Sequence, residues 1–314
     1  MMNESLNEEA AAFADALFDI AARTGIEISQ TPNGSRIIDA GINAKGGINA
    51  GQILADLCLS HRGTATVTSG PDGQPTVEVT TDDPVTACLQ SQYAGWRISV
   101  DKYFAMGSGP MRALAAREEL FEKLPIDEQS DVAVGVLETS QLPNDAVTDY
   151  LAQRCGISPE NLTLLVAPTA SVAGTIQVVA RSVETAMHKL FELGFDVRRV
   201  RSGFGTAPLP PVAKDDLAGI GRTNDAILYG GCVTLWVDGD DESLADIGPR
   251  VPSSAAECHG RPFLQIFKEA GYDFYKIDPL LFSPAEITFH NVETGNAFRF
   301  GQREPEVLRE SFGI

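Results

Sequence analysis

Arg181 and Glu184 are the residues whose types and spacing most directly suggest chemistry in this sequence. They stand three positions apart in "LLVAPTASVAGTIQVVARSVETAMHKL" (164–190), a stretch that predicts a buried strand, a break at Pro168 and then a helix. Residues three apart are neighbours on a helix surface. On a solvated face the two would form an ordinary ion pair. In a pocket the same groups could hold a water molecule and accept its proton. The spacing alone leaves both interpretations open.

The predicted helix has two contrasting faces at 3.6 residues per turn. The apolar face holds Ile176, Val179, Val183, Ala186 and Leu190. The opposite, polar strip holds Gln177, Arg181, Glu184 and His188.

Other common catalytic motifs are missing from the sequence. It contains no G-x-S-x-G, S-x-x-K, P-loop or H-E-x-x-H pattern. The five cysteines form no C-x-x-C pair and the four histidines lie far apart, so we expect no metal site and no disulfide framework. Acid–base chemistry by carboxylates and cations is what remains.

Composition and charge narrow the class of protein. The chain has 314 residues, 43% of them hydrophobic, and a net charge of −19. We therefore expect no nucleic-acid partner, since phosphate binding needs a clustered basic patch. No apolar run approaches the roughly 18 residues that span a bilayer, and the acidic, helical N-terminal stretch is unlike a signal peptide. We expect a cytoplasmic protein with no membrane partner.

The pattern of elements predicts an α/β fold. Strands alternate with helices through the middle of the chain, for example "DVAVGVLE", "PNDAVTDYLAQRC" and "LTLLVAP". We expect two interwoven α/β lobes with a cleft between them. Segments 1–95 and 240–314 would share one lobe, and 96–239 would form the other and carry the helix of Arg181. A cleft between lobes is a usual place for a small-molecule site.

Two further stretches could contact a ligand. "DKYFAMGSGPMRAL" (101–114) is expected to be a loop that enters a helix, and its glycine-rich turn could present backbone N–H groups to an anion. Arg112 stands where a dinucleotide fingerprint would have its third glycine, which argues against a Rossmann site. The segment 205–231 is dense in proline, glycine and charge, so it is either a functional loop or a surface excursion.

Four long stretches together resemble one family. They are "DKYFAMGSGPMRALA", "LVAPTASVAGTIQVVARSVETAMHK", "APLPPVAKDDLAGIGRTNDAILYGG" and "GRPFLQIFKEAGYDFYKIDPLLFSPAEI". In this order they resemble the methenyltetrahydromethanopterin cyclohydrolases, over nearly the whole chain. The resemblance implies hydrolysis of the cyclic amidinium of N5,N10-methenyl-tetrahydromethanopterin to the N5-formyl derivative, with no metal or organic cofactor. It also implies a homotrimer and a pterin held between two α/β lobes.

The same resemblance implies roles for individual residues. The family's catalytic Arg-x-x-Glu falls on Arg181 and Glu184. Residues of the matching stretches expected to contact the pterin are Ser108, Gly109, Pro168, Thr169, Ala170, Ser171, Gln177, Asn224 and Asp225. A one-carbon transferase or a non-catalytic pterin-binding protein on the same scaffold remains as an alternative.

Overall fold

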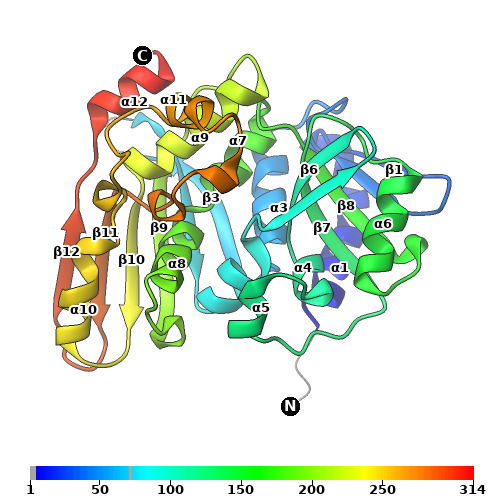
Figure 1. Cartoon of the computed structure of the whole chain (residues 1–314). Helices are drawn as coiled ribbons and strands as arrows, with labels where there is room; N and C mark the ends of the chain where they lie inside the picture. The colour runs from blue at the N-terminus through cyan, green and yellow to red at the C-terminus, as the bar shows by residue number, and fades with distance from the viewer. Residues whose placement is uncertain (1–4, 71–72) are drawn as a thin grey trace. The chain divides into compact units, whose positions relative to one another are not determined.

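The computed structural model describes residues 5–70 and 73–314. The chain divides into two compact units, each with a six-stranded mixed sheet, which confirms the predicted α/β class (Figure 1). Unit 1 comprises the chain up to Arg62 together with Leu89–Gln177, and unit 2 comprises Gly63–Cys88 and Val178–Ile314. This grouping differs from the predicted lobes 1–95 with 240–314 and 96–239. Strand pairing explains the difference, because the C-terminal strands pair with strands of the middle segment and none of them pairs with the first two strands.

Unit 1 is built on the sheet order β1-β2-β8-β7-β6-β5. Strands β2, β8 and β7 run parallel, and the remaining pairs are antiparallel. Its strands are β1 (Glu27–Gln30), β2 (Arg36–Asp39), β5 (Trp96–Val100), β6 (Tyr103–Ser108), β7 (Ala133–Glu138) and β8 (Leu162–Ala167). Its helices include α1 (Leu6–Ala16), α2 (Ala21–Thr24), α3 (Ile48–Cys58), α4 (Met111–Ala115), α5 (Glu119–Lys123), α6 (Asp145–Cys155) and α7 (Val172–Val179).

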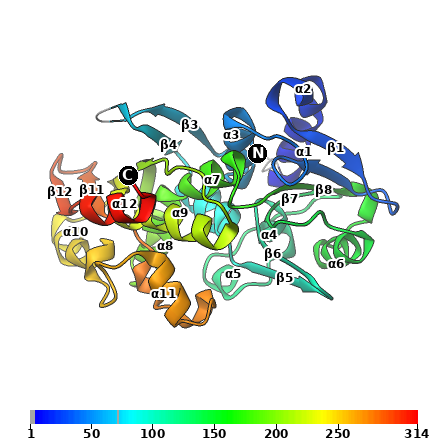
Figure 2. The same cartoon turned by 90° about the horizontal axis from the view of Figure 1, so that it is seen from above.

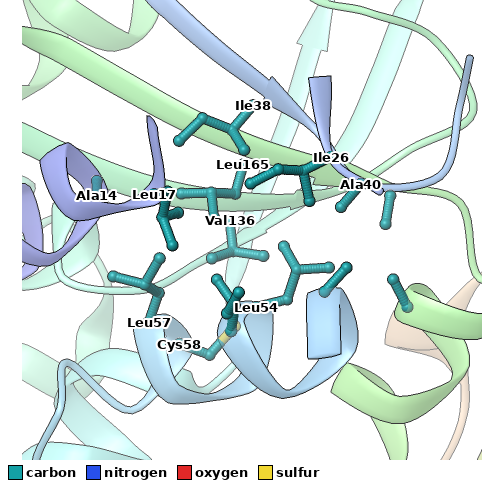
Figure 3. Packing of buried hydrophobic residues seen from close by; sticks show 14 of the residues in the cluster. Ala14, Leu17, Ile26, Ile38, Ala40, Leu54, Leu57, Cys58, Val136 and Leu165 are labelled. Carbon is teal, nitrogen blue, oxygen red and sulfur yellow. The ribbon is translucent and has the colours of Figure 1, made fainter. Parts of the chain in front are cut away.

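The parallel strands of unit 1 are buried on both faces, which explains their unbroken apolar sequences. Leu165 and its alternating neighbours face α1 and α3, whereas Leu164 faces the cluster that includes α6. Figure 3 shows the first of these layers, with Leu54 and Leu57 of α3 packed beneath Val136 and Leu165. Unit 1 is therefore a sheet with an apolar layer on each side.

Unit 2 is built on the sheet order β12-β11-β10-β9-β4-β3, in which only the described pair β10–β11 is parallel. Its strands are β3 (Gly63–Ser69), β4 (Pro75–Thr81), β9 (Val200–Pro208), β10 (Cys232–Val237), β11 (Glu286–Asn291) and β12 (Ala297–Gly301). Its helices include α8 (Ser182–Glu192), α9 (Asp216–Gly230), α10 (Asp241–Ile247), α11 (Phe263–Glu269) and α12 (Pro305–Phe312). Figure 2 shows α8 and α10 on one side of these strands.

Three local predictions need correction. Tyr103–Ser108, expected to be a loop, forms β6 and pairs with β5 and β7. Much of the segment 205–231 is the 15-residue helix α9, which begins at the N-cap Asp215. Gly221 of α9 lets α11 pack closely, because a Cβ at Gly221 would lie 2.9 Å from the Cβ of Leu264. The helix predicted to run through Arg181 is divided into α7 and α8 at that residue.

Residues Val85–Gln92 form a π-helix, η3. π-Helices are rare, and those that occur often lie at functional sites. The end of η3 is held by Arg112, whose buried guanidinium donates to the carbonyls of Leu89 (3.1 Å) and Ser91 (3.0 Å). The same guanidinium binds Glu118 through two hydrogen bonds of 2.8 and 2.5 Å. Arg112, which broke the dinucleotide fingerprint, therefore satisfies the carbonyls of η3.

Candidate active site

Arg181 and Glu184 both lie at the junction of α7 and α8. Arg181 is the N-cap of α8, with φ −93° and ψ 13°, and Glu184 is the third residue of that helix. The Arg181 carbonyl accepts from the Thr185 N–H at 2.9 Å, so the first turn of α8 is formed directly at this residue. The first turn is where the helix dipole favours a negative charge. The break in the helix therefore places the carboxylate of Glu184 at a helix start.

Both charged side chains are buried. Arg181 is 7% exposed and Glu184 is 5% exposed. The other members of the polar strip, Gln177 and His188, are buried as well. Charged groups are seldom removed from water without a partner or a function. This burial contradicts the interpretation of the strip as a solvated face.

The α8 N-terminus sits directly on strand β9 because two residues of that strand lack a side chain. A Cβ on Gly205 would lie 2.5 Å from Ser182 Oγ, and one on Gly203 would lie 2.6 Å from Val183 Cγ1. The hydroxyl of Ser182 is buried and makes no hydrogen bond in the described chain. The packing of Ser182 against Gly205 sets the distance between the start of α8 and the sheet. This distance in turn sets the position of Glu184.

Cys88 of η3 lies within electrostatic reach of this pair. Burial raises its pKa well above the ordinary value, the charge of Glu184 raises it further, and Arg181 opposes both effects. The thiol is therefore neutral at physiological pH and is no nucleophile. Cys88 is thus an apolar neighbour of the charged pair, and it is contributed by the π-helix.

Two further residues of α8, His188 and Lys189, are titratable but have other roles. Burial, followed by the charge of Lys189, lowers the pKa of His188 to about 4, so the imidazole is neutral at physiological pH. Burial also lowers the pKa of Lys189 to about 8, against the opposing charges of Asp278 and Cys258. The Lys189 Nζ donates to the carbonyl of Leu280. His188 is therefore no acid at neutral pH, and Lys189 ties α8 to the segment around Leu280.

In unit 1 the structure brings Ser108 and Gln177 together through Cys58. The Cys58 Sγ lies 3.3 Å from Ser108 Oγ and donates to Gln177 Oε1 at 3.7 Å. All three side chains are buried. Next to Ser108, Gly109 has φ +90°, a conformation that favours glycine, and its N–H donates to the Ser91 carbonyl at 3.0 Å. Nothing in the sequence pointed to Cys58, a lone cysteine in an apolar helix.

The turn of Pro168, Thr169, Ala170 and Ser171 follows β8 and opens α7. Ser171 Oγ donates to the Pro168 carbonyl at 2.8 Å and accepts from the Gly174 N–H at 2.9 Å, so it caps the helix. Thr169 is buried and donates to Glu138 Oε1.

Glu138 is a further candidate that the sequence analysis missed. It ends β7, beside the end of the parallel strand β8. Ligands of open α/β sheets bind at the carboxyl ends of such strands. A single acidic residue closing an otherwise apolar run of six was the signal available for it.

Asn224 and Asp225 have internal contacts on α9. Asn224 Nδ2 donates to the Ile220 carbonyl at 2.8 Å. The carboxylate of Asp225 accepts from the Phe263 N–H at 2.7 Å and from Ser311 Oγ at 2.6 Å. Asp225 is fully buried, and burial raises its pKa to about 7. These contacts give Asp225 a structural role, joining α9 to α11 and α12.

Two other kinds of feature are absent from the described residues. Across residues 5–70 and 73–314, no group of three or more His, Cys, Asp or Glu side chains could hold a metal ion. In the same part of the chain, no helix is long and apolar enough to cross a membrane.

Comparison with known proteins identifies the family. Residues 5–312 match the family model described as "Cyclohydrolase (MCH)". The chain belongs to this family. Curated relatives named methenyltetrahydromethanopterin cyclohydrolase come from bacteria and archaea. The one from Rhodopirellula baltica is 50% identical over 289 residues, 90% of this chain and 87% of its own. The one from Methylobacillus flagellatus is 45% identical, covering 98% and 95% of the two chains. The archaeal relative from Methanococcoides burtonii is 42% identical, covering 99% and 98%. The family resemblance predicted from the four sequence stretches is confirmed.

Proposed function

We propose that this chain hydrolyses the methenyl bridge of N5,N10-methenyl-tetrahydromethanopterin to give the N5-formyl derivative, as a step of one-carbon metabolism. Membership of the cyclohydrolase family and the names of its relatives support the reaction. The observation that supports the mechanism is the burial of Arg181 and Glu184 together at the start of α8.

The methenyl carbon is an electrophilic cation and needs a water molecule and a base. Glu184 takes one proton from the water as the oxygen bonds to the carbon. Arg181 orients the carboxylate and holds the developing oxygen. The bond from the carbon to N10 then breaks, its electron pair goes to N10, and Glu184 returns the proton there. The second proton of the water leaves to solvent as the formyl C=O forms.

No metal or organic cofactor takes part in this proposal, because the substrate already carries the positive charge that a metal would otherwise supply. We further propose that the protein works in the cytoplasm as a homotrimer. The proposed pterin contacts are Ser108, Gly109, Gln177 and the turn 168–171, with Asn224 held in place on α9. Asp225 supports that helix from within.

The test is an absorbance assay of the methenyl chromophore in the presence of EDTA. Glu184→Gln is expected to keep substrate binding and to lose turnover by about 10²–10⁴-fold. Glu192→Gln is the matched control, because Glu192 is an exposed carboxylate two turns further along the same helix. Unchanged turnover in Glu184→Gln would remove the proposed base. Saturable binding by the wild type without turnover would instead identify a pterin-binding protein.

A further inference from the structure

Strand β2 ends at a buried carboxylate that the following loop encloses. Asp39 is the last residue of β2 and is 3% exposed. Its Oδ1 accepts from the N–H groups of Gly41 at 2.9 Å and Ile42 at 2.7 Å. Its Oδ2 accepts from the N–H groups of Asn43 at 2.7 Å and Ala44 at 3.0 Å. Four successive backbone donors therefore point at one side chain.

The loop that encloses Asp39 lies at the carboxyl edge of the parallel strands. We call residues 40–47 the Asp39 loop; it leads from β2 to Gly47, the N-cap of α3. Strand β2 pairs in parallel with β8, where Asp39 stands beside Val166. Loops at this edge commonly bind anionic ligands through free backbone N–H groups. Here Asp39 takes the N–H groups of residues 41–44, so that part of the loop is closed to an anion and is shaped from within.

The Asp39 loop contacts the turn 168–171 that follows β8. A Cβ on Gly41 would lie 2.7 Å from Ser171 Oγ and 3.5 Å from Pro168 Cδ, so the loop and the turn have no room between them. Ser171 Oγ in turn donates to the Pro168 carbonyl and accepts from the Gly174 N–H. The loop thus bears on the same hydroxyl that caps α7.

The far end of the Asp39 loop is fixed as well. Gly46 has φ +60°, a conformation that favours glycine, and its N–H donates to the Gly25 carbonyl at 2.9 Å. Beyond the loop, α3 packs closely on α7, because a Cβ on Gly51 would lie 2.7 Å from the Cβ of Ile176. A loop held at both ends cannot absorb a change at its centre, so a change at Asp39 is passed to the turn 168–171.

We propose that Asp39 is a positioning residue for substrate binding. Its carboxylate sets the shape of the Asp39 loop, and the loop sets the position of the turn 168–171. The inference rests on the proposed function, in which that turn contacts the pterin. Arg181 and Glu184, which carry the chemistry, belong to unit 2, whereas Asp39, its loop and the turn belong to unit 1. Loss of the carboxylate should therefore raise KM and leave kcat nearly unchanged.

The variant Asp39→Asn tests this split. The amide has nearly the size of the carboxylate, but its oxygen can serve only two of the four N–H groups, and its NH2 group faces the other two donors. KM for the methenyl substrate is expected to rise roughly tenfold or more, since small displacements of binding groups cost large factors. A variant that only folded less well would lose kcat at unchanged KM, because fewer molecules would be active. Either that result or unchanged kinetics would overturn the proposal.

The matched control is Asp131→Asn. Asp131 is an exposed carboxylate just before β7, at the opposite edge of the same parallel strands. The control should keep both kinetic constants. A rise in KM equal to that of Asp39→Asn would mean that the effect comes from lost charge alone, against the proposal.

Chemical rescue tests whether the carboxylate itself is what the loop needs. Asp39→Ala leaves space for a small carboxylate among the N–H groups of residues 41–44. Formate, compared with chloride at equal ionic strength, should lower the KM of Asp39→Ala toward the wild-type value. It should not change the KM of the wild type or of Asp39→Asn, where the space is filled. A raised KM that formate leaves unchanged in Asp39→Ala would contradict the role of the carboxylate.

A further variant leaves the carboxylate in place. Gly41→Ala sets a methyl group 2.7 Å from Ser171 Oγ, so the turn must move while the contacts of Asp39 remain. KM should rise here too, and this result is available even if the Asp39 variants do not fold. An unchanged KM would show that the loop does not position the turn.

Hydrogen exchange separates this proposal from the hydrolysis itself. In the full chain without substrate, Asp39→Asn should speed exchange at the N–H groups of residues 41–44. It should also speed exchange at Gly174 and Thr175, which donate to Ser171. Faster exchange confined to residues 41–44 would overturn the positioning role. A wild type that does not turn over the methenyl substrate would instead refute the hydrolysis, so the two failures are distinguishable.

Discussion

Replacing Asp225 by asparagine should stabilise the protein at neutral and alkaline pH. The carboxylate is fully buried, and its oxygens accept from the Phe263 N–H and from Ser311 Oγ. In Asp225→Asn the amide oxygen still accepts from Phe263, and the amide nitrogen donates to Ser311. The substitution therefore keeps both contacts and removes a buried charge.

The pKa of Asp225 sets the magnitude. Burial raises it from the ordinary 3.8 to about 7, and Glu310 raises it further against the two hydrogen bonds. Between those values the folded protein binds a proton that the unfolded chain has lost. Stability from this group is therefore complete below about pH 4 and is lost as pH rises to about 7. A shift of about three units corresponds to an upper bound of about 4 kcal/mol.

Denaturant unfolding at pH 4, 6 and 8 measures the effect. The difference between Asp225→Asn and wild type should be near zero at pH 4 and should reach its maximum above pH 7. Asp246→Asn, on the exposed side of α10, is the control and should change little. The reasoning fails if Asp225→Asn is less stable than wild type at pH 8, or if the pH dependence is unchanged. A large rise in KM at unchanged stability would return Asp225 to the ligand-contacting residues.

Three other substitutions test the supports of the site. Gly205→Ala should destabilise by about 1–3 kcal/mol and lower kcat, because its Cβ would meet Ser182 Oγ at 2.5 Å; unchanged unfolding and kinetics would argue against a fixed seat for α8. Arg112→Leu should cost about 3–5 kcal/mol in thermal or denaturant unfolding, since it frees the carbonyls of η3 and leaves Glu118 unpaired; a loss below 1 kcal/mol would contradict this. Lys189→Met tests the lowered pKa of Lys189, about 8. As pH rises from 8 to 10.5, the free energy of unfolding of the wild type should rise by up to about 3 kcal/mol relative to the variant, because the folded protein has already lost this proton and the unfolded chain has not. Parallel plots of unfolding free energy against pH for the two proteins would refute this.

Sequence patterns predicted the elements of this chain better than their pairing. The hairpins of β1 with β2 and of β3 with β4 fit the alternating residues of their strands. The buried strands β7 and β8 followed from apolar runs. Which strands share a sheet depends on contacts between distant segments, so the lobe boundaries did not follow from the sequence.

The features nearest the candidate site were the least predictable. The residue pattern of 85–92 does not distinguish a π-helix, with its i→i+5 hydrogen bonds, from an α-helix, so the sequence carried no signal for it. The close packing of the α8 start, next to Arg181, depends on Gly203 and Gly205 of a strand that comes some twenty residues later in the chain. By contrast, the Arg181–Glu184 pair was predicted from its spacing and the family resemblance together. Its burial depends on packing between distant segments and was not predictable from the sequence.

The order of segments in unit 2 has a consequence for synthesis on the ribosome. The hairpin of β3 and β4 is complete at Thr81, but β4 pairs with β9, which begins at Val200. At 5–20 residues per second, the roughly 120 residues between them take about 6–24 s to emerge. Throughout that interval the β4 edge has no partner, while unit 1 receives all its strands by Ala167. The hairpin is rich in threonine, and a polar strand edge is a poor template for aggregation while it lacks its partner. Unit 1 can thus be formed before the strands that complete unit 2 exist.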